Sequence, residues 1–438
     1  MKKAVISKRD SIVKTALDIG NMKIKAVIGE LSSDGSQLKV LGYAEVPSRG
    51  MKKSVIENPE ELSQCVSYVL GQLRDQTGEN IEKVSIGISG EAIKSRTTNM
   101  KYQFEEKEIS EKEVETLFRM SAHELLSGKE RILKKEIYNI RVNNSGIIKN
   151  PIGTVGKEIQ GDVHLIYIDE AEVEKLVEVV NRAGVEVEHM LLNAYASAKA
   201  VLDDEDRRMG VALIDIGEGS TDIILFKNDK LIYTKSLPLG GMHYVNDISY
   251  LFQISKQEAF EILSKLRDKE IHDAHIYCGT SKKVAVDDIK NIIDARTGDI
   301  INFIAQTIEE SGFNGYLGKG LVLTGGAVVI DGLLDKINKK TGYVVRKVLP
   351  TAFRGLEDVD SSQATVIGIF TEVMEDEYNK VQAKLNSPEP EVQEKKEEDI
   401  EESLENLEKI LEEAQEKEKP EKKNGVMKGI KSWFSNFI

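Results

Sequence analysis

Two short segments far apart in the chain carry the same three residues, Asp-Ile-Gly, at the end of an apolar run. Asp18 and Asp215 are the acidic residues, and Gly20 and Gly217 complete the two motifs. A glycine in such a place lets the backbone turn tightly and present its N–H groups to a phosphate without a Cβ in the way. Two carboxylates facing each other across a cleft suit Mg²⁺, which keeps several waters and contacts a protein mostly through them. The two segments therefore predict loops for a polyphosphate and its metal ion.

Amide, ammonium and hydroxyl groups follow these glycines, and a polyphosphate tail needs donors of these kinds. The two loops continue as Asn21-Met22-Lys23 and Glu218-Gly219-Ser220-Thr221-Asp222. A third glycine loop stands between a predicted strand and a predicted helix, a suitable place for the ribose and α-phosphate of a nucleotide. It reads Leu323-Thr324-Gly325-Gly326-Ala327. Each motif is short, so the prediction depends on their arrangement in the chain.

The elements around the two Asp-Ile-Gly segments repeat as well. Residues 15–46 and 211–239 both read as three apolar strands joined by two short polar turns, and 197 positions separate the two aspartates. This spacing is too long for a solenoid repeat, so we predict two related α/β halves that each open with a three-stranded meander. Between the copies, short strands around a charged helix at about 111–126 predict a small α+β insertion. Helices dominate the prediction from about 245 to 311.

The composition limits the classes of function. The chain has 438 residues and a formal net charge of −14, with 40% hydrophobic residues. A net-acidic chain without a block of Lys and Arg argues against a nucleic-acid partner. Its two cysteines, Cys65 and Cys278, form no CxxC motif and favour a reducing cytosol. Nothing approaches the roughly 18 consecutive apolar residues of a membrane span.

The acidity is concentrated near the C-terminus. Residues 388–423 hold 15 Asp and Glu against 7 Lys, so this segment carries −8 of the net −14. High charge and low hydrophobicity predict a disordered, self-repelling linker. Within it, helical spacing of a few apolar residues indicates at most a solvated, transient helix. These residues are Ile400, Leu404, Leu407 and Leu411.

The last residues, 425–438, have a different character. Wound as a helix, they gather apolar and aromatic side chains on or beside one face, with two lysines elsewhere. The apolar set is Val426, Met427, Ile430, Trp433, Phe434 and Phe437, and the lysines are Lys428 and Lys431. This pattern predicts an interfacial anchor on anionic lipid, which polymerisation would strengthen by multiplying weak contacts. The alternative is a helix that docks on the folded body or in a partner groove.

In chain order, the three glycine loops resemble the phosphate-1, phosphate-2 and adenosine motifs of the actin/Hsp70/sugar-kinase ATPase superfamily. They read Asp-Ile-Gly-x-x-Lys, Asp-Ile-Gly-x-Gly-Ser/Thr-Thr-Asp and Thr-Gly-Gly-Ala. Within the superfamily the chain is similar to the FtsA family of bacterial cell division proteins, over about residues 15–371 and at the C-terminal tip. The small insertion is placed as in that family. The stretch Asn150–Gly156, leading into Asp162-Val163-His164, is similar to the exit of its extra subdomain.

The resemblance implies a duplicated actin/Hsp70-like (ribonuclease H-like) α/β fold with a small SHS2-like α+β insertion, a disordered acidic linker and a C-terminal amphipathic helix. The implied domains are a first half at 1–84 and 166–208 (1A), the insertion at 85–165 (1C), a second half at 209–239 and 316–375 (2A), a helical lobe at 240–315 (2B), the linker at 376–424 and the membrane-targeting helix at 425–438.

The same resemblance implies a site for ATP and Mg²⁺. Asp18 and Asp215 would hold the metal largely through water, and Asp215 and Asn193 are the candidates for catalysis, with Asn193 orienting a water. The implied nucleotide-binding residues are Asp18, Gly20, Asn21, Met22, Lys23, Asp215, Gly217, Glu218, Gly219, Ser220, Thr221, Glu261, Lys265, Gly325 and Gly326.

The chain departs from the family pattern at three places in this site. Asn21 stands where Ser or Thr is usual, and its amide can still donate. Glu218 replaces a glycine, and its negative charge beside a polyanion is expected to weaken binding or slow hydrolysis. The helix that carries Glu261 and Lys265 lacks the family's usual spacing for the adenine–ribose contacts.

The function implied is an actin-like, ATP-binding cell division protein with weak or no ATP hydrolysis. It would polymerise, lie on the cytoplasmic side of the membrane at the division septum, and anchor filaments of the tubulin-like FtsZ there. The C-terminal peptide of FtsZ would dock on the helical lobe within about 239–315, and other division proteins are expected partners. The alternatives are an actin-like pilus or secretion assembly ATPase of the PilM type and, further off, a sugar-kinase-like enzyme.

Overall fold

The computed structural model describes residues 11–386, except 53, 268–269, 271–272, 279–281 and 329–331. All but the last described residue belong to the compact unit Met1–Leu385. The predicted amphipathic helix at 425–438 and the linker beyond residue 386 lie outside the described residues. Among the described helices, none is long and apolar enough to cross a membrane.

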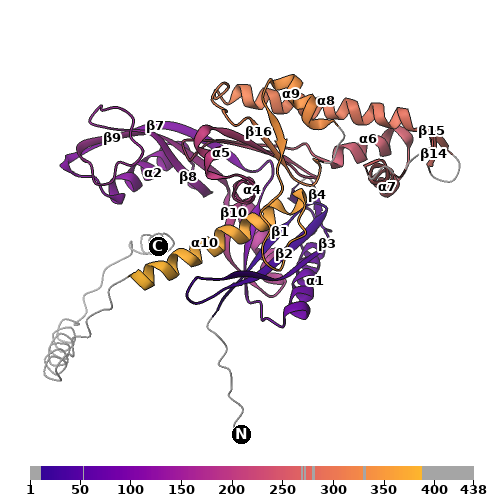
Figure 1. Cartoon of the computed structure of the whole chain (residues 1–438), viewed down its shortest axis with the longest axis horizontal. Helices are drawn as coiled ribbons and strands as arrows, with labels where there is room; N and C mark the ends of the chain where they lie inside the picture. The colour runs from indigo at the N-terminus through magenta and orange to yellow at the C-terminus, as the bar shows by residue number, and fades with distance from the viewer. Residues whose placement is uncertain are drawn as a thin grey trace, which may run out of the picture. The chain divides into compact units, whose positions relative to one another are not determined.

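Two five-stranded sheets form the centre of the described body, and they have the same strand order (Figure 1). In each sheet three antiparallel strands that are consecutive in their half of the chain make a meander, and two more strands extend it in parallel from the first. The first sheet contains β3 (Leu38–Pro47), β2 (Lys23–Leu31), β1 (Ile12–Ile19), β6 (Lys83–Ile88) and β10 (Glu186–Leu192). The second contains β13 (Lys230–Leu237), β12 (Thr221–Lys227), β11 (Val211–Ile216), β16 (Leu321–Thr324) and β17 (Val345–Lys347). The predicted duplication is confirmed.

Helices cover both sheets, which is why their inner strands are continuous apolar runs. On the first sheet, α1 (Pro59–Thr77) and α3 (Glu170–Arg182) pack together on one face. The helices α4 (Asn193–Val201) and α10 (Ala364–Asn386) cross so closely that a Cβ on Gly368 would lie 1.7 Å from the carbonyl oxygen of Ala196. Buried side chains of α8 (Val286–Glu310) and α9 (Leu333–Thr341) fill the core of the second sheet.

The insertion is a three-stranded sheet with one helix. Its elements are β7 (Lys94–Glu108), α2 (Glu111–Leu125), β8 (Glu130–Val142) and β9 (Val155–Asp169), with strand order β7-β9-β8. The sheet packs against the edge strand β13 of the second half. At that junction the buried His164 ring lies 2.8 Å from the Thr97 hydroxyl and 3.4 Å from the Thr234 hydroxyl. Burial lowers the pKa of His164 to about 4, so the ring is neutral at physiological pH.

The segment predicted as mainly helical also contains a β-hairpin. The helices are α6 (Met242–Phe252), α7 (Lys256–Arg267) and α8, but β14 (His275–Cys278) and β15 (Lys282–Ala285) pair between the last two. Strands of four residues carry too little periodicity to be recognised in the sequence. Four short elements complete the body: β4 (Met51–Lys52), which pairs with β5 (Val55–Ile56), α5 (Asp204–Met209) and the 3-10 turn η1 (Ser361–Gln363).

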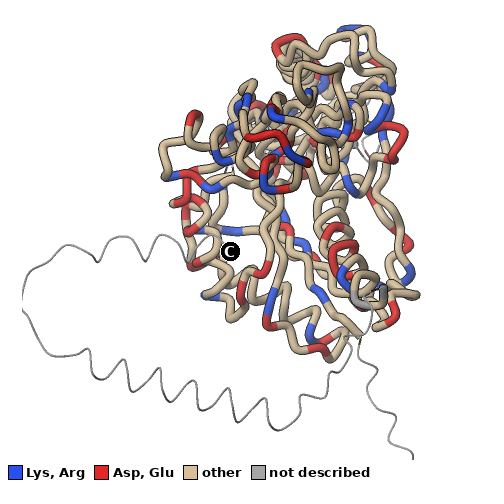
Figure 2. The backbone as a smooth tube through the Cα atoms, turned by 90° about the vertical axis from the view of Figure 1, so that its left-hand side faces the viewer, with Lys and Arg blue, Asp and Glu red and all other residues tan. Residues whose placement is uncertain are grey.

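The last helix corrects one predicted boundary. The sequence placed the start of the linker at residue 376, but α10 continues to Asn386. An ion pair holds this part to the body, since Glu377 lies 3.4 Å from Lys14. Just before it, Glu375 lies 2.5 Å from Lys199. Acidic and basic residues are interspersed along the face in view in Figure 2.

Candidate functional site

A cavity of about 500 Å³ lies where the three glycine loops meet. It is lined from both halves of the chain, and most of the predicted site residues contribute. These are Asp18, Gly20, Asn21, Met22, Lys23, Asn193, Asp215, Gly217, Glu218, Gly219, Ser220, Gly325 and Gly326. Thr221, Glu261 and Lys265 are outside the lining, whereas Phe260, the neighbour of Glu261 in α7, is part of it.

The first Asp-Ile-Gly hairpin joins β1 to β2. Asp18 stands opposite Lys25 in the register, and the turn closes where the N–H of Gly20 donates to the carbonyl of Lys23 at 3.1 Å. Lys25 is 7% exposed and is the one buried lysine of the described residues. Its ammonium group donates to the carbonyl of Ser362 in η1. Lys25 is therefore a fixed positive charge in the cavity wall, beside Asp18.

The second Asp-Ile-Gly hairpin repeats this backbone. Asp215 stands opposite Asp222, and the N–H of Gly217 donates to the carbonyl of Ser220 at 2.9 Å. Both turns therefore have the same length and the same closing hydrogen bond. Asp222 occupies the position in the second hairpin that corresponds to Lys25 in the first. Equivalent positions in the two hairpins therefore carry opposite charges.

The cavity holds more negative than positive buried charge. Burial raises the pKa of Asp18 to about 6, with Lys25 opposing the rise and Asp215 adding to it. Burial also raises the pKa of Asp215, although the Ser197 hydroxyl donates to its carboxylate at 2.6 Å. Burial raises the pKa of Asp222 to about 7. Lys25 interacts with Asp18 and Asp215 but not with Asp222. The excess of carboxylates over this one buried ammonium group makes a site that favours an added cation.

The third glycine loop is pressed onto the second hairpin. Gly325 has a φ of 99°, and a Cβ there would lie 2.4 Å from an Asp215 carboxylate oxygen. The N–H of Gly325 donates to the carbonyl of Ser361 at 3.0 Å, and the Ser361 hydroxyl returns a hydrogen bond to the Gly325 carbonyl at 3.0 Å. Only glycine meets both the positive φ and the close approach.

The start of α6 packs against Glu218, a residue of the cavity lining. The N–H of Met242 donates to the carbonyl of Glu218 at 2.8 Å, and a Cβ on Gly241 would lie 2.5 Å from the Glu218 carboxylate. The predicted conflict of Glu218 with a polyanion is therefore reduced, because its charge lies at the N-terminal end of a helix, where negative charge is stabilised.

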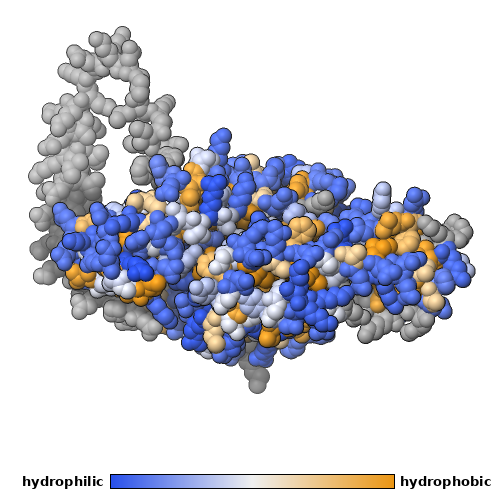
Figure 3. All heavy atoms as spheres, turned by 90° about the horizontal axis from the view of Figure 1, so that it is seen from above, coloured by the Kyte–Doolittle hydropathy of each residue, from blue (hydrophilic) through white to orange (hydrophobic). Residues whose placement is uncertain are grey.

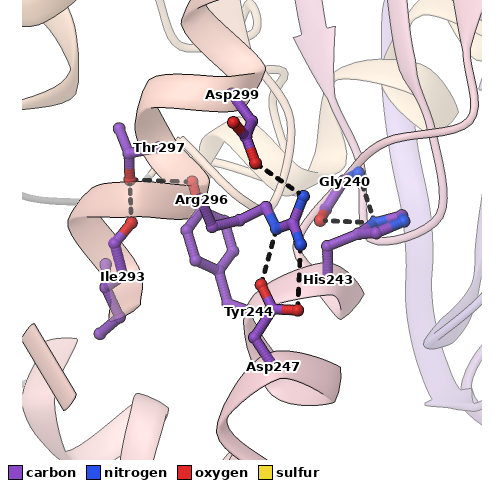
Figure 4. Close-up of polar contacts among 8 residues, drawn as sticks. All are labelled: Gly240, His243, Tyr244, Asp247, Ile293, Arg296, Thr297 and Asp299. Carbon is purple, nitrogen blue, oxygen red and sulfur yellow. Dashed lines mark hydrogen bonds and ion pairs between the residues drawn. The ribbon is translucent and has the colours of Figure 1, made fainter. Parts of the chain in front are cut away.

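Contacts between α6 and α8 fix this helix in place (Figure 4). The Arg296 guanidinium donates to both carboxylate oxygens of Asp247, at 2.7 and 3.0 Å. The Tyr244 and Thr297 hydroxyls lie 3.1 Å apart. The helix that contacts the second Asp-Ile-Gly loop is therefore itself held by α8.

The lysine singled out in the sequence is less enclosed than the one that was overlooked. Lys23 is about half exposed and pairs with Glu45, whose carboxylate also accepts from the Tyr43 hydroxyl at 2.8 Å. Lys25 was not singled out, and Asp222 was noted in its loop without a role. Counting the register across each hairpin would have found both, since they stand opposite the two motif aspartates.

The donor set fits a magnesium ion that is bound mainly through water. Among the described residues, no three His, Cys, Asp or Glu side chains are placed to hold a metal together. Asp18 and Asp215 supply oxygens from the two facing loops, as Mg²⁺ requires. The buried Asn193 amide donates to Asp18 at 3.5 Å, and its carbonyl oxygen has no protein partner within the described part of the chain.

Comparison with known proteins identifies the family. The model described as "Cell division protein FtsA" matches residues 212–420, and that described as "SHS2 domain inserted in FTSA" matches residues 90–167. The FtsA of Pseudomonas aeruginosa is 27% identical over 352 residues, covering 78% of this chain and 84% of the relative. The FtsA of Bacillus subtilis is 29% identical over 334 residues, covering 73% and 74%.

A solved structure supports the fold. The PilM–PilN type IV pilus biogenesis complex aligns with a TM-score of 0.60 at 15% identity, over 82% of this chain and 98% of that chain. Identity this low shows the fold alone. With two family models that match different parts of the chain and relatives that align over most of its length, the chain belongs to the FtsA family of bacterial cell division proteins, which have an actin-like fold.

Proposed function

We propose that the cavity between the glycine loops binds ATP with Mg²⁺. The observation that supports this most is the pairing of two hairpins with the same closing hydrogen bond, whose aspartates and glycines line one cavity. The backbone N–H groups of the loops would hold the phosphates, and Asp18 and Asp215 would hold the ion through water. When bound, the ion would neutralise phosphate charge and orient the triphosphate. The nucleoside would lie next to the Gly325–Gly326 loop.

We expect little ATP turnover. Phosphoryl transfer in such a site depends on positioning a water and neutralising charge. Asn193 is the candidate to accept from that water, because its buried carbonyl oxygen has no other partner in the described residues. Its amide is a weak base, so it can orient a water but not deprotonate it. ATP would then act mainly as a ligand that controls conformation and assembly.

The test of the nucleotide site is titration calorimetry with Mg-ATP. Wild type is expected to bind, and Asp215→Ala to lose binding by at least about 100-fold, since it removes a buried carboxylate beside the metal. Asp294→Ala is the matched control, because Asp294 is an exposed residue of α8 paired with Lys336. Absence of binding by wild type would reject the site.

We further propose that this division protein polymerises and tethers FtsZ filaments to the cytoplasmic face of the membrane at the septum. The membrane contact is assigned to the amphipathic segment 425–438, which lies outside the described residues. Co-sedimentation with anionic vesicles should require this segment, so a chain that ends at Asn424 is expected to stay in the supernatant. Equal sedimentation of the two chains would reject the anchor.

The helical lobe is the proposed docking surface for the FtsZ tail. Tyr250 and Leu251 of α6 are 82% and 54% exposed, and Tyr277 of β14 is 74% exposed. Figure 3 shows apolar side chains gathered at the lobe end of the described body. Exposed aromatic residues of this kind mark partner surfaces more often than chance. Tyr250→Ser is expected to weaken binding of a labelled FtsZ peptide, measured by fluorescence anisotropy, and Tyr378→Ser on α10 is the control.

Family membership favours this division role over the two alternatives. A pilus-assembly role is supported by the similar fold of the PilM–PilN complex, which is 15% identical in sequence. The sugar-kinase role would require turnover stimulated by a small hydroxylated substrate. A phosphate-release assay with and without such a substrate separates that role from the one proposed.

A further inference from the structure

The Asn21 side chain is held by a second surface turn next to the cavity. The strands β4 and β5 pair through Met51 with Ile56 and Lys52 with Val55, so Ser54 lies in the turn between them. The backbone N–H of Ser54 donates to the Asn21 amide oxygen at 2.8 Å. The Asn21 amide nitrogen donates to the Ser54 hydroxyl at 3.1 Å. Both polar atoms of the Asn21 amide therefore form hydrogen bonds with Ser54, and these bonds fix which side of the amide is the oxygen and which is the nitrogen.

These two hydrogen bonds leave one N–H of the Asn21 amide for a ligand. An amide nitrogen carries two hydrogens, and Ser54 accepts one of them. The same nitrogen faces the second glycine loop, since a Cβ on Gly219 would lie 2.3 Å from it. The amide oxygen, which would repel phosphate, is turned towards Ser54 by the Ser54 N–H. The donor side of Asn21 is thus the side next to the loops that line the cavity.

Ser54 adopts a backbone conformation that is unfavourable for its residue type. Its φ is 60°, in the left-handed region where glycine is preferred. The residue it packs against is Gly90, where a Cβ would lie 2.6 Å from the Ser54 Cβ. A serine in this conformation costs stability that a glycine would not. Its hydroxyl, bonded to Asn21, is the group that a glycine would lack.

We propose that Ser54 is a positioning residue that orients the Asn21 amide so that its N–H, and not its carbonyl, meets the phosphates of the bound nucleotide. The inference rests on the proposed nucleotide site and adds a residue to it. It also explains how Asn serves at a position where the family usually has a hydroxyl. A hydroxyl donates and accepts by rotation, whereas an amide must be held in the correct one of two orientations.

The test is Ser54→Gly, which removes the hydroxyl and suits the local φ. The melting temperature is expected to stay the same or rise. Ser54→Gly keeps the backbone N–H that holds the Asn21 amide oxygen and removes only the hydroxyl that holds the amide nitrogen. Mg-ATP affinity is therefore expected to fall by about fivefold, the value of one hydrogen bond between neutral groups. Asn228→Gly is the matched control, because Asn228 has a φ of 52° in the turn between β12 and β13 and is not part of the cavity lining. It should leave affinity unchanged.

Rescue distinguishes positioning from a general structural role. Asn21→Thr supplies a hydroxyl that needs no external orientation, so adding Ser54→Gly to it should change affinity by less than about twofold. An equal loss in both backgrounds, or unchanged affinity in Ser54→Gly alone, would overturn the role of Ser54. Failure of wild type to bind Mg-ATP would instead overturn the nucleotide site itself.

Discussion

The two Asp-Ile-Gly hairpins share a backbone and differ in charge. Each has an aspartate at the end of its first strand, a turn of the same length and one closing hydrogen bond from the motif glycine. Opposite the aspartate, the first hairpin has Lys25 and the second Asp222. Within the turn, the first has Asn21 and the second Glu218. The first hairpin is therefore the more positive one and the second the more negative.

Their supports differ in the same way. The first loop is held from outside by the Ser54 turn, and the second by the start of α6. A helix N-terminus stabilises a nearby negative charge, as found at Glu218, whereas a serine turn orients a neutral amide. The duplicated backbone thus supplies a symmetric frame, and side-chain divergence makes one wall more positive and the other more negative.

The largest expected effect comes from Lys25→Met, which removes the positive charge of the first hairpin. Asp18 and Asp215 would lose their buried counter-charge, so the free energy of unfolding should fall by about 3 kcal/mol. Chemical denaturation without nucleotide measures this. Lys23→Met is the control, because Lys23 is about half exposed and should change stability by less than about 0.5 kcal/mol. Equal losses of stability in the two variants would contradict the assignment of Lys25 as the buried counter-charge and Lys23 as an exposed one.

Gly219→Ala should have the next largest effect. A Cβ at this position would lie 2.3 Å from the Asn21 amide nitrogen, so the two loops must separate. Mg-ATP affinity is expected to fall by about tenfold. The corresponding residue of the first loop is Met22, which already carries a side chain, so Met22→Ala should change affinity by less than about threefold. Both are measured by calorimetry. A larger loss in Met22→Ala would show that the loops are not packed in this asymmetric way.

Much of this frame could be predicted from the sequence, because it depends on local signals. The meanders follow from apolar strands that are separated by short polar turns. The helix α2 begins at the predicted Glu111 because Ser110 and Glu113 form a capping box. The three glycine loops were predicted to meet, and they line one cavity. Such features depend on residues close together in the chain.

What could not be predicted depends on long-range contacts. Lys25 lies within an apolar strand, and only its register opposite Asp18 indicates a place in the cavity. The end of α10 is rich in charge and was assigned to the linker, although the ion pair of Glu377 with Lys14 holds it in place. The sequence also did not show which face of α7 is turned to the cavity. In the structure Phe260 lines the cavity and Glu261 does not.

A smaller effect is expected from Asp222→Asn, and its sign is opposite to that of Lys25→Met. The pKa of Asp222 is raised to about 7 from an ordinary value of 3.8. Between these values the folded protein holds a proton that the unfolded chain has lost, so stability falls as pH rises through this window. Asn does not titrate. The variant should therefore be more stable by about 1 kcal/mol at pH 8, with the gain shrinking to nothing near pH 4.

This prediction is checked by denaturation of both proteins at a series of pH values without Mg²⁺. Comparing the two proteins at each pH cancels other groups, such as His164, whose lowered pKa of about 4 makes stability rise with pH between about 4 and 6.5. A gain that is the same at every pH would mean that Asp222 is not a buried charge.

The smallest expected effects come from the turn residues that differ in charge. Glu218→Gln removes a negative charge from the cavity lining, so Mg-ATP affinity should rise by about threefold. The rise is limited because the N-terminus of α6 already stabilises the Glu218 charge. Asn21→Asp adds the same charge to the first loop and removes its donor, so affinity should fall, and by more than Glu218→Gln raises it. Calorimetry at two salt concentrations measures both. If Glu218→Gln weakened binding, the Glu218 carboxylate would be holding α6 against the loop, and the second hairpin would depend on its negative charge for its shape.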